Sequence, residues 1–316
     1  SDPFVYEWDI AVPPPEEYLH ITGRVLAGGE EPMPLIGGKV FAVSVETGNE
    51  SSTVVTGEDG SFDILVQPLE EVDMETYRIH LRPSSENELV PKLVLDEIQL
   101  EDSVDIGDVV VEGLQDYIDV SVYVVDSTGT FGPSELAETA VRFTGQIGGG
   151  VLQVDRLVDS EGKVEVALPR ANYVLSVSPP SRTIQGEDQP YGIHQQLLKF
   201  HYAKEDSKFV EVALAPKPEI HGFVFDSAGT VIPAARVEAT YTGKGLYPDA
   251  PLPSRVFEAQ TDETGRYRLG LDAGQYTIVV VPPEESGQPR RVDRDVYIPS
   301  SQQRTFELAE PSVVSG

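Results

Sequence analysis

The stretch Asp262-Glu263-Thr264-Gly265-Arg266-Tyr267-Arg268-Leu269 decides the fold, because it reads as a tight turn followed by a strand. An Asp side chain accepts a hydrogen bond from the backbone two residues on, and Gly tolerates a positive φ, so Asp262 and Gly265 predict the turn. From Tyr267 onward every second residue is apolar, which is typical of a strand that buries one face. The stretch therefore predicts antiparallel β structure built from short strands.

The same turn and strand occur twice more in the chain. Glu58-Asp59-Gly60-Ser61-Phe62-Asp63-Ile64 and Asp159-Ser160-Glu161-Gly162-Lys163-Val164-Glu165-Val166 are the two other copies. The glycines Gly60, Gly162 and Gly265 lie 102 and 103 residues apart. A period of about 100 residues corresponds to one β-sandwich domain per repeat. We expect about seven short strands in each repeat, with a weak helical pattern only over residues 133–138.

Further motifs of the third repeat extend the pattern. They are Gly222-Phe223-Val224-Phe225-Asp226, Ala235-Arg236-Val237, Thr261 before the turn, and Gly274-Gln275-Tyr276-Thr277-Ile278-Val279-Val280. In these residues the chain resembles the carboxypeptidase regulatory-like, transthyretin-like family of Ig-like β-sandwich domains. The resemblance implies three tandem copies of one sandwich, used as accessory modules of envelope or secreted proteins, with no catalytic residue to transfer.

The first two repeats depart from the family pattern. The first has Ala27 where an Asp is expected and carries an insertion around residues 69–75. The second has Ser121 near the place of the opening Gly, and Asn172 before Tyr173.

The repeats set the expected domain organisation. An extension over residues 1–17 precedes three domains over residues 18–113, 114–217 and 218–316. We expect an all-β protein of three tandem Ig-like, transthyretin-like antiparallel sandwiches in an elongated arrangement, because the linkers near residues 112–115 and 216–219 are short. Residues 4–10 of the extension alternate like a strand, which predicts a strand added to the first domain or, alternatively, an edge strand offered to a partner.

The charge of the chain is strongly negative and unevenly spread. With 53 acidic and 23 basic side chains, the formal net charge is −30, so nucleic acid and anionic membrane surfaces are poor partners. Residues 1–113 hold 25 acids and 5 bases (−20), whereas residues 114–217 and 218–316 each hold 14 acids and 9 bases (−5). This concentration predicts an environment or partner rich in cations, such as salt, calcium or a basic surface.

Catalytic signals are absent from the sequence. There is no Cys, so disulfides, Cys-based zinc sites and thiol nucleophiles are excluded. No Gly-x-Ser-x-Gly, His-Glu-x-x-His or Walker motif occurs, and no histidines are paired at metal-ligand spacing. No apolar run approaches the roughly 18 residues of a membrane-spanning helix. We therefore expect a protein that is not an enzyme.

The acidic turns are the strongest candidate sites for a cofactor, and that cofactor would be calcium. Asp and Glu supply the oxygen ligands that calcium prefers, although no segment has the alternating acidic ladder of a dedicated calcium loop. The favoured alternative is that each Asp binds its own backbone. The metal candidates are Asp59, Asp159, Glu161, Asp262 and Glu263.

Aromatic residues in loops are candidates for binding a partner or a sugar. Tyr247 lies in the long loop 243–253, and a second group lies in the Gly- and Pro-containing segment 185–202. The alternative is that these loops pack over the edges of the sandwiches. The binding candidates are Tyr191, His194, Tyr202, Tyr247 and the single Trp8; the dense basic cluster Arg290, Arg291 and Arg294 predicts instead a solvated edge strand or a contact to the acidic first domain.

Together these features predict a non-catalytic modular protein of a bacterial cell surface or periplasm, acting as a spacer, adhesion or protein-binding module. A carbohydrate-binding protein is one alternative, and an accessory region of a secreted enzyme whose catalytic domain lies outside this chain is another. The expected partner is a protein or polysaccharide at the cell surface. The chain begins at Ser1 without Met, which predicts a processed or truncated product, with a lipid anchor upstream as one possibility.

Overall fold

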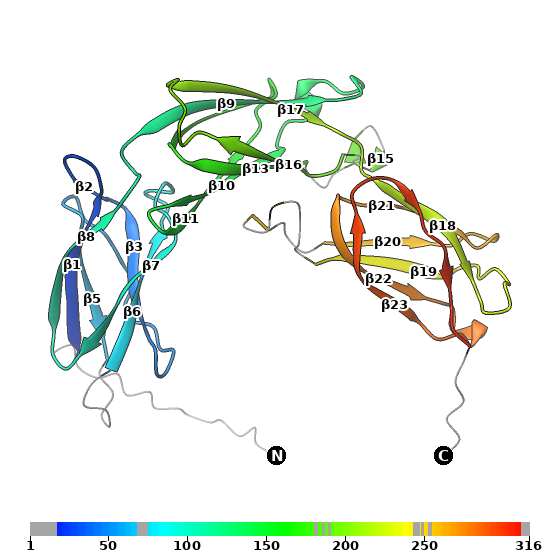
Figure 1. Ribbon diagram of the computed structural model, residues 1–316, viewed down its shortest axis with the longest axis horizontal. Helices are drawn as coiled ribbons and strands as arrows, with labels where there is room; N and C mark the ends of the chain where they lie inside the picture. Colours follow the sequence, from blue (N-terminus) through cyan, green and yellow to red (C-terminus); the bar gives the residue numbers. More distant parts are fainter. Residues whose placement is uncertain are drawn as a thin grey trace, which may run out of the picture. The chain divides into compact units, whose positions relative to one another are not determined.

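The computed structural model consists of strands joined by turns (Figure 1). It describes residues 18–67, 75–179, 183–184, 187–188, 191–242, 247, 250–251 and 255–310. Within these ranges the helical segments are two short 3-10 turns, η2 (Pro133–Glu135) and η3 (Glu284–Ser286). The predicted all-β fold class is confirmed. None of the described helices has the length and apolar character needed to cross a membrane. The extension 1–17 with Trp8, and residues 69–74 of the predicted insertion, lie outside the described residues.

The chain divides into two compact units. One comprises Ser1–Tyr117, Gly145–Val154 and Leu168–Ala171, and the other comprises Ile118–Thr144, Asp155–Ala167 and Asn172–Gly316. The sheets nevertheless follow one another along the chain in three successive pairs. The domain boundaries at residues 113 and 217 stay a prediction.

The first pair of sheets uses residues 19–111, and apolar side chains such as Ile21, Val40, Ile64 and Ile79 are fully buried there. One sheet contains β1 (Leu19–Ala27), β2 (Met33–Pro34), β5 (Ser61–Val66) and β8 (Val104–Val111). The other has the order β4 (Val54–Val55), β3 (Gly38–Ser44), β6 (Glu75–Pro83) and β7 (Leu93–Leu100).

The second pair of sheets uses residues 117–214. A three-stranded sheet has the order β12 (Lys163–Pro169), β9 (Tyr117–Asp126) and β17 (Ser207–Leu214). A four-stranded sheet has the order β11 (Gly150–Leu157), β10 (Ala140–Ile147), β13 (Asn172–Ser178) and β16 (His194–Lys199). A small hairpin of β14 (Thr183–Ile184) and β15 (Glu187–Asp188) stands apart from both.

The third pair of sheets encloses one apolar core, to which Tyr267, Tyr276 and Phe306 contribute fully buried rings. One sheet contains β21 (Arg266–Gly270), β18 (Glu219–Phe225), β24 (Gln302–Gln303) and β25 (Phe306–Glu307). The other has the order β20 (Val256–Gln260), β19 (Arg236–Tyr241), β22 (Gly274–Val281) and β23 (Arg291–Ile298).

The turn at Asp262–Gly265, its two repeats and the strand after it have the predicted geometry. Gly60, Gly162 and Gly265 have φ values of +78°, +81° and +74°, a region that L side chains rarely adopt. In β21, Tyr267 and Leu269 are buried, whereas the arginines that alternate with them are exposed. The turn and the alternation are therefore confirmed.

Candidate functional site

In all three pairs of sheets, the first strand lies parallel to the last. β1 pairs with β8, β9 pairs with β17, and β18 pairs with β24 and then with β25. We call the stretch of chain that forms one pair of sheets a segment. We call each of these parallel pairings a terminal clamp, because it joins the two ends of a segment by backbone hydrogen bonds. Parallel ladders of this kind hold strands that are far apart in the sequence.

The three terminal clamps differ in continuity. The second runs without a break from Ser207↔Asp119 to Leu214↔Asp126. The first contains a register shift between Thr22 and Arg24. The third is the shortest, with two residue pairs from β24 and two from β25.

A glycine marks each interruption. Gly23 lies at the register shift of the first clamp, and Gly222 lies opposite the break between β24 and β25. A Cβ added at Gly222 would stand 2.0 Å from the carbonyl oxygen of Arg304, so the close approach of the backbone there requires glycine. The second segment, which has Ser121 near the corresponding place, has an unbroken ladder. The departure of its sequence from the family pattern thus coincides with a difference in backbone geometry.

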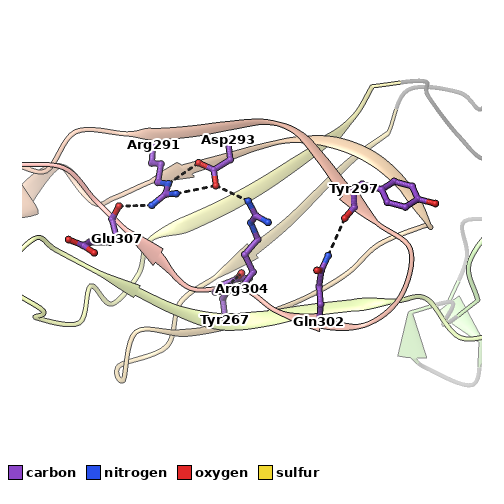
Figure 2. A network of polar contacts seen from close by, with 7 residues as sticks. All are labelled: Tyr267, Arg291, Asp293, Tyr297, Gln302, Arg304 and Glu307. Atoms are coloured by element: carbon purple, nitrogen blue, oxygen red, sulfur yellow. Dashed lines mark hydrogen bonds and ion pairs between the residues drawn. The ribbon is translucent and has the colours of Figure 1, made fainter.

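A polar network surrounds the break in the third clamp (Figure 2). The carboxylate of Asp293 on β23 accepts hydrogen bonds from Arg291 Nε (2.8 Å) and Arg304 Nη2 (3.0 Å). The hydroxyl of Tyr267 donates to the carbonyl of Arg304 (2.6 Å), and Arg291 Nη1 donates to the carbonyl of Glu307 (2.9 Å). The network therefore ties β23, an edge strand of one sheet, to the closing segment of the other.

The network is partly shielded from water. The side chain of Asp293 is 16% exposed, and the guanidinium groups of Arg291 and Arg304 lie 5.7 and 5.8 Å from the centre of the Phe306 ring, within the range of a cation–π interaction. Burial alone would raise the pKa of Asp293, but the hydrogen bonds from the two arginines outweigh burial and hold this pKa below its usual value. Asp293 is therefore charged at neutral pH.

We expect Asp293→Asn to lower the free energy of unfolding of this segment by about 2 kcal/mol at neutral pH, because two arginines lose their shared counter-charge. A folded-state pKa below the unfolded one adds stability above the unfolded pKa, and this stability is lost as the pH falls through the folded value. The difference between variant and parent should therefore shrink below about pH 4. Hydrogen exchange of the full chain, at neutral pH and below about pH 4, measures the difference in stability between the variant and the parent. Asp295→Asn, an exposed change on the same strand, is the control; an equal effect of both variants would contradict the prediction.

The acids proposed as calcium ligands are engaged in turns. Asp262 Oδ1 accepts the backbone N–H groups of Thr264 (2.8 Å) and Arg266 (3.0 Å). Asp159 Oδ1 accepts those of Glu161 and Lys163, both at 2.9 Å. Each of these two carboxylates thus satisfies two donors of its own turn.

Asp59 acts in the same way, since its Oδ1 accepts the N–H of Ser61 at 3.0 Å. Hydrogen bonds from Ser61 lower the pKa of Asp59, and those from Thr264 and the Arg266 backbone lower the pKa of Asp262. The favoured turn role is confirmed. Glu161 and Glu263 are exposed, and within the described ranges no three His, Asp or Glu side chains gather in a metal-binding group. Calcium binding at these turns stays a prediction.

The aromatic candidates occupy different environments. Tyr191 is buried, with its ring edge-on to Phe131 at 5.9 Å, so this ring offers no surface for stacking on a sugar. Tyr202 is 87% exposed, and its ring lies edge-on to the neighbouring ring of His201, with 4.4 Å between their centres. His194 and Tyr247 are half-buried. Among the described residues, no ring contact or hydrogen bond joins any two of these candidates.

The basic cluster of the third segment is divided by the fold. β23 lies at the edge of its sheet, as predicted for a solvated edge strand. Arg291 points into the polar network, whereas Arg290 and Arg294 are exposed. Sequence reasoning missed the partners Asp293 and Arg304. The alternation Arg291-Val292-Asp293 could have indicated the first of them, because residues two apart on a strand lie on the same face and can form an ion pair.

Comparison with known families gives a match to one part of the chain. A family model described as the carboxypeptidase regulatory-like domain matches residues 219–309. The predicted resemblance is thus confirmed for the third repeat, whereas the presence of this domain in three tandem copies stays a prediction. The search of curated proteins found no match.

Solved structures with similarity to the chain include three proteins of Gram-positive bacteria. They are the Bacillus anthracis TIE protein (13% identity, 92% of this chain and 51% of that chain, TM-score 0.26), a Streptococcal ancillary pilin (11%, 92% and 99%, 0.28) and BcpA, the major pilin subunit of Bacillus cereus (11%, 93% and 100%, 0.23). The chain therefore spans about half the length of the Bacillus anthracis protein.

Proposed function

We propose that this chain is a non-catalytic, extracytoplasmic spacer that carries tension between its two ends. The observation that supports the proposal is the terminal clamp, which recurs in all three pairs of sheets. The family model matched by residues 219–309 supports an accessory role, because its description names a regulatory-like domain rather than a catalytic one.

The clamp suits tension because of its direction. In a parallel pair, the start of the first strand and the end of the last strand lie at opposite ends of the ladder. A pull on the two ends of the segment drives the strands past each other, so the hydrogen bonds between them are loaded together rather than one after another. Forced unfolding depends on the height of this barrier rather than on the equilibrium stability.

In this interpretation, the side chains that could have taken part in catalysis or metal binding stabilise the fold instead. The turn carboxylates of Asp59, Asp159 and Asp262 bind backbone N–H groups, and Asp293 binds two arginines. These interactions rigidify the connections between strands, which a spacer needs. The alternative role as an accessory region of a secreted enzyme would use the same rigidity.

Pulling the full chain by its two ends in a single-molecule force experiment tests the proposal. We expect three unfolding events, with the second segment unfolding at the highest force, since its clamp is the unbroken one, and the third at the lowest. An insertion of about 15 glycine and serine residues after the exposed Lys204 lengthens the event of the second segment by about 50 Å and so identifies it.

Two outcomes would contradict the proposal. One is unfolding without resolved force events, which would mean that the strands separate one hydrogen bond at a time. The other is a lengthened event at the lowest force, because continuity of the clamp would then not determine resistance.

A further inference from the structure

The most acidic part of the chain gathers its few basic side chains on one sheet. Residues 1–113 hold 25 acids and only 5 bases. Four of these five bases lie on β3 and β6 or directly before β7, in the sheet β4-β3-β6-β7. The four are Lys39, Arg78, Arg82 and Lys92, and the fifth, Arg24, lies on the other sheet and pairs with Asp108 at 2.8 Å.

Two of these bases face each other directly. Lys39 on β3 lies opposite Arg82 on β6, and both are exposed because the residues that alternate with them, such as Val40 and Leu81, are buried. Like charges opposite one another destabilise a sheet. Arg78 is paired with Glu97 (2.7 Å), but no described side chain forms an ion pair with Lys39, Arg82 or Lys92. The fold therefore keeps three cations close together without a counter-charge from its described residues.

An aromatic ring holds part of this cluster in position. Phe41 lies on the outward face of β3, yet it is only 4% exposed. The ring of His80 stacks on it (5.0 Å between centres, 11° between planes), and the Arg82 guanidinium lies 4.6 Å from its centre. Burial and the charge of Arg82 lower the pKa of His80, so the imidazole is neutral at pH 7 and the positive charge comes from the neighbouring bases.

A hollow of about 390 Å³ opens beside this cluster. His80, Leu81, Arg82, Lys92, Leu93 and Val94 line it. The lining has two charged bases and an apolar wall, of which Val94 is 54% exposed, and none of the described residues in it is an acid. The described acid whose charge acts on His80 is Glu50, which does not belong to the lining. The volume lies near the lower end of the range for small-ligand sites.

We propose that this hollow binds an acidic sugar residue, with Arg82 and Lys92 on its carboxylate or sulfate group and Leu93 and Val94 against its ring. A sugar ring with one anionic substituent presents both kinds of surface that the hollow offers. Arginine suits the anionic group, because its planar fork can donate two hydrogen bonds to one carboxylate or sulfate. The negative charge elsewhere on the segment is screened beyond about 8 Å at physiological ionic strength, so the cluster acts locally. This site would give the proposed spacer a point of attachment.

Binding of short oligosaccharides to the full chain at about 0.15 M salt tests the proposal. The probes are oligogalacturonate, which carries carboxylates, a low-mass dextran sulfate, and neutral dextran. We expect one or both acidic probes to bind and neutral dextran not to bind; the two acidic probes distinguish carboxylate from sulfate recognition. Arg82→Gln and Lys92→Gln should each weaken binding about tenfold, which is the loss of one hydrogen bond between charged groups.

Arg24→Gln is the matched control, because it removes the same charge from the same part of the chain but from the other sheet. It should change binding by no more than about twofold. Among the described residues, no aromatic ring contacts Lys92, so Lys92→Gln remains informative even if Arg82→Gln loosens Phe41. Three results would overturn the proposal: neither acidic probe binds, Arg24→Gln weakens binding as much as Arg82→Gln and Lys92→Gln, or an oligoglutamate of equal charge binds as tightly as the sugars.

Discussion

Replacing Gly222 with alanine is expected to lower the free energy of unfolding of residues 219–309 by about 3 kcal/mol. The new Cβ would stand 2.0 Å from the carbonyl oxygen of Arg304 and 2.7 Å from its carbonyl carbon. These are backbone atoms, which cannot rotate away as the end of a flexible side chain can. β18 must therefore move apart from the segment between β24 and β25, and the bond from Tyr267 to the Arg304 carbonyl is disturbed as well.

Hydrogen exchange of the full chain, followed by mass spectrometry, measures this effect locally. Peptides that cover β18 and the segment 302–307 should lose protection, whereas those of the first pair of sheets should not. Gly270→Ala is the matched control, since a Cβ there meets nothing closer than 3.8 Å. Unchanged protection of β18 in the Gly222 variant would show that the backbone can accommodate the methyl group.

Thr261→Val should lower the free energy of unfolding of the same residues by a similar amount, about 3 kcal/mol. The reason is that it removes two buried hydrogen bonds without changing the shape of the side chain. The Thr261 hydroxyl accepts the N–H of Ala235 (2.7 Å) and donates to the carbonyl of Ile232 (2.8 Å), and the residue is only 5% exposed. Valine would leave both backbone groups buried without a partner, and each such group costs about 1–3 kcal/mol.

The same exchange measurement on the full chain tests this substitution. Thr277→Val, on the half-buried part of β22, is the control and should have little effect. Thr56 makes the equivalent bonds to Gly38 and Leu35 in the first pair of sheets, so Thr56→Val should behave like Thr261→Val there. Equal protection in the Thr261 and Thr277 variants would refute the assigned role of the hydroxyl.

Local features of the fold could be predicted from the sequence because they depend on neighbouring residues. Asp262 and Gly265 form the turn that their side chains favour, and the alternation after Tyr267 places the buried face of β21. The loss of the opening glycine at Ser121 was visible in the sequence too. Its meaning, an unbroken terminal clamp, was not, because it depends on pairing with a strand that begins at Ser207.

Contacts between residues far apart in the sequence account for what sequence reasoning missed. Lys39 and Arg82 are 43 positions apart and become neighbours only through the register of β3 and β6. Asp293 meets Arg304 only because the last segment crosses from one sheet to the other. Tyr191 was a binding candidate because it follows a Gly- and Pro-containing stretch, yet the ring of Phe131, 60 positions earlier, packs against it. None of these pairings follows from local propensity.

In the proposed spacer, the unequal terminal clamps would also set the order in which the segments unfold under high force. Segments in series bear the same force, so the one with the two-residue pairings gives way first. Unfolding of this segment adds about 100 residues of extended chain, roughly 300 Å in length, and the force on the remaining segments drops. In the proposed spacer, this interrupted ladder would limit the force on the chain, because the third segment unfolds and can refold while the other two segments stay folded.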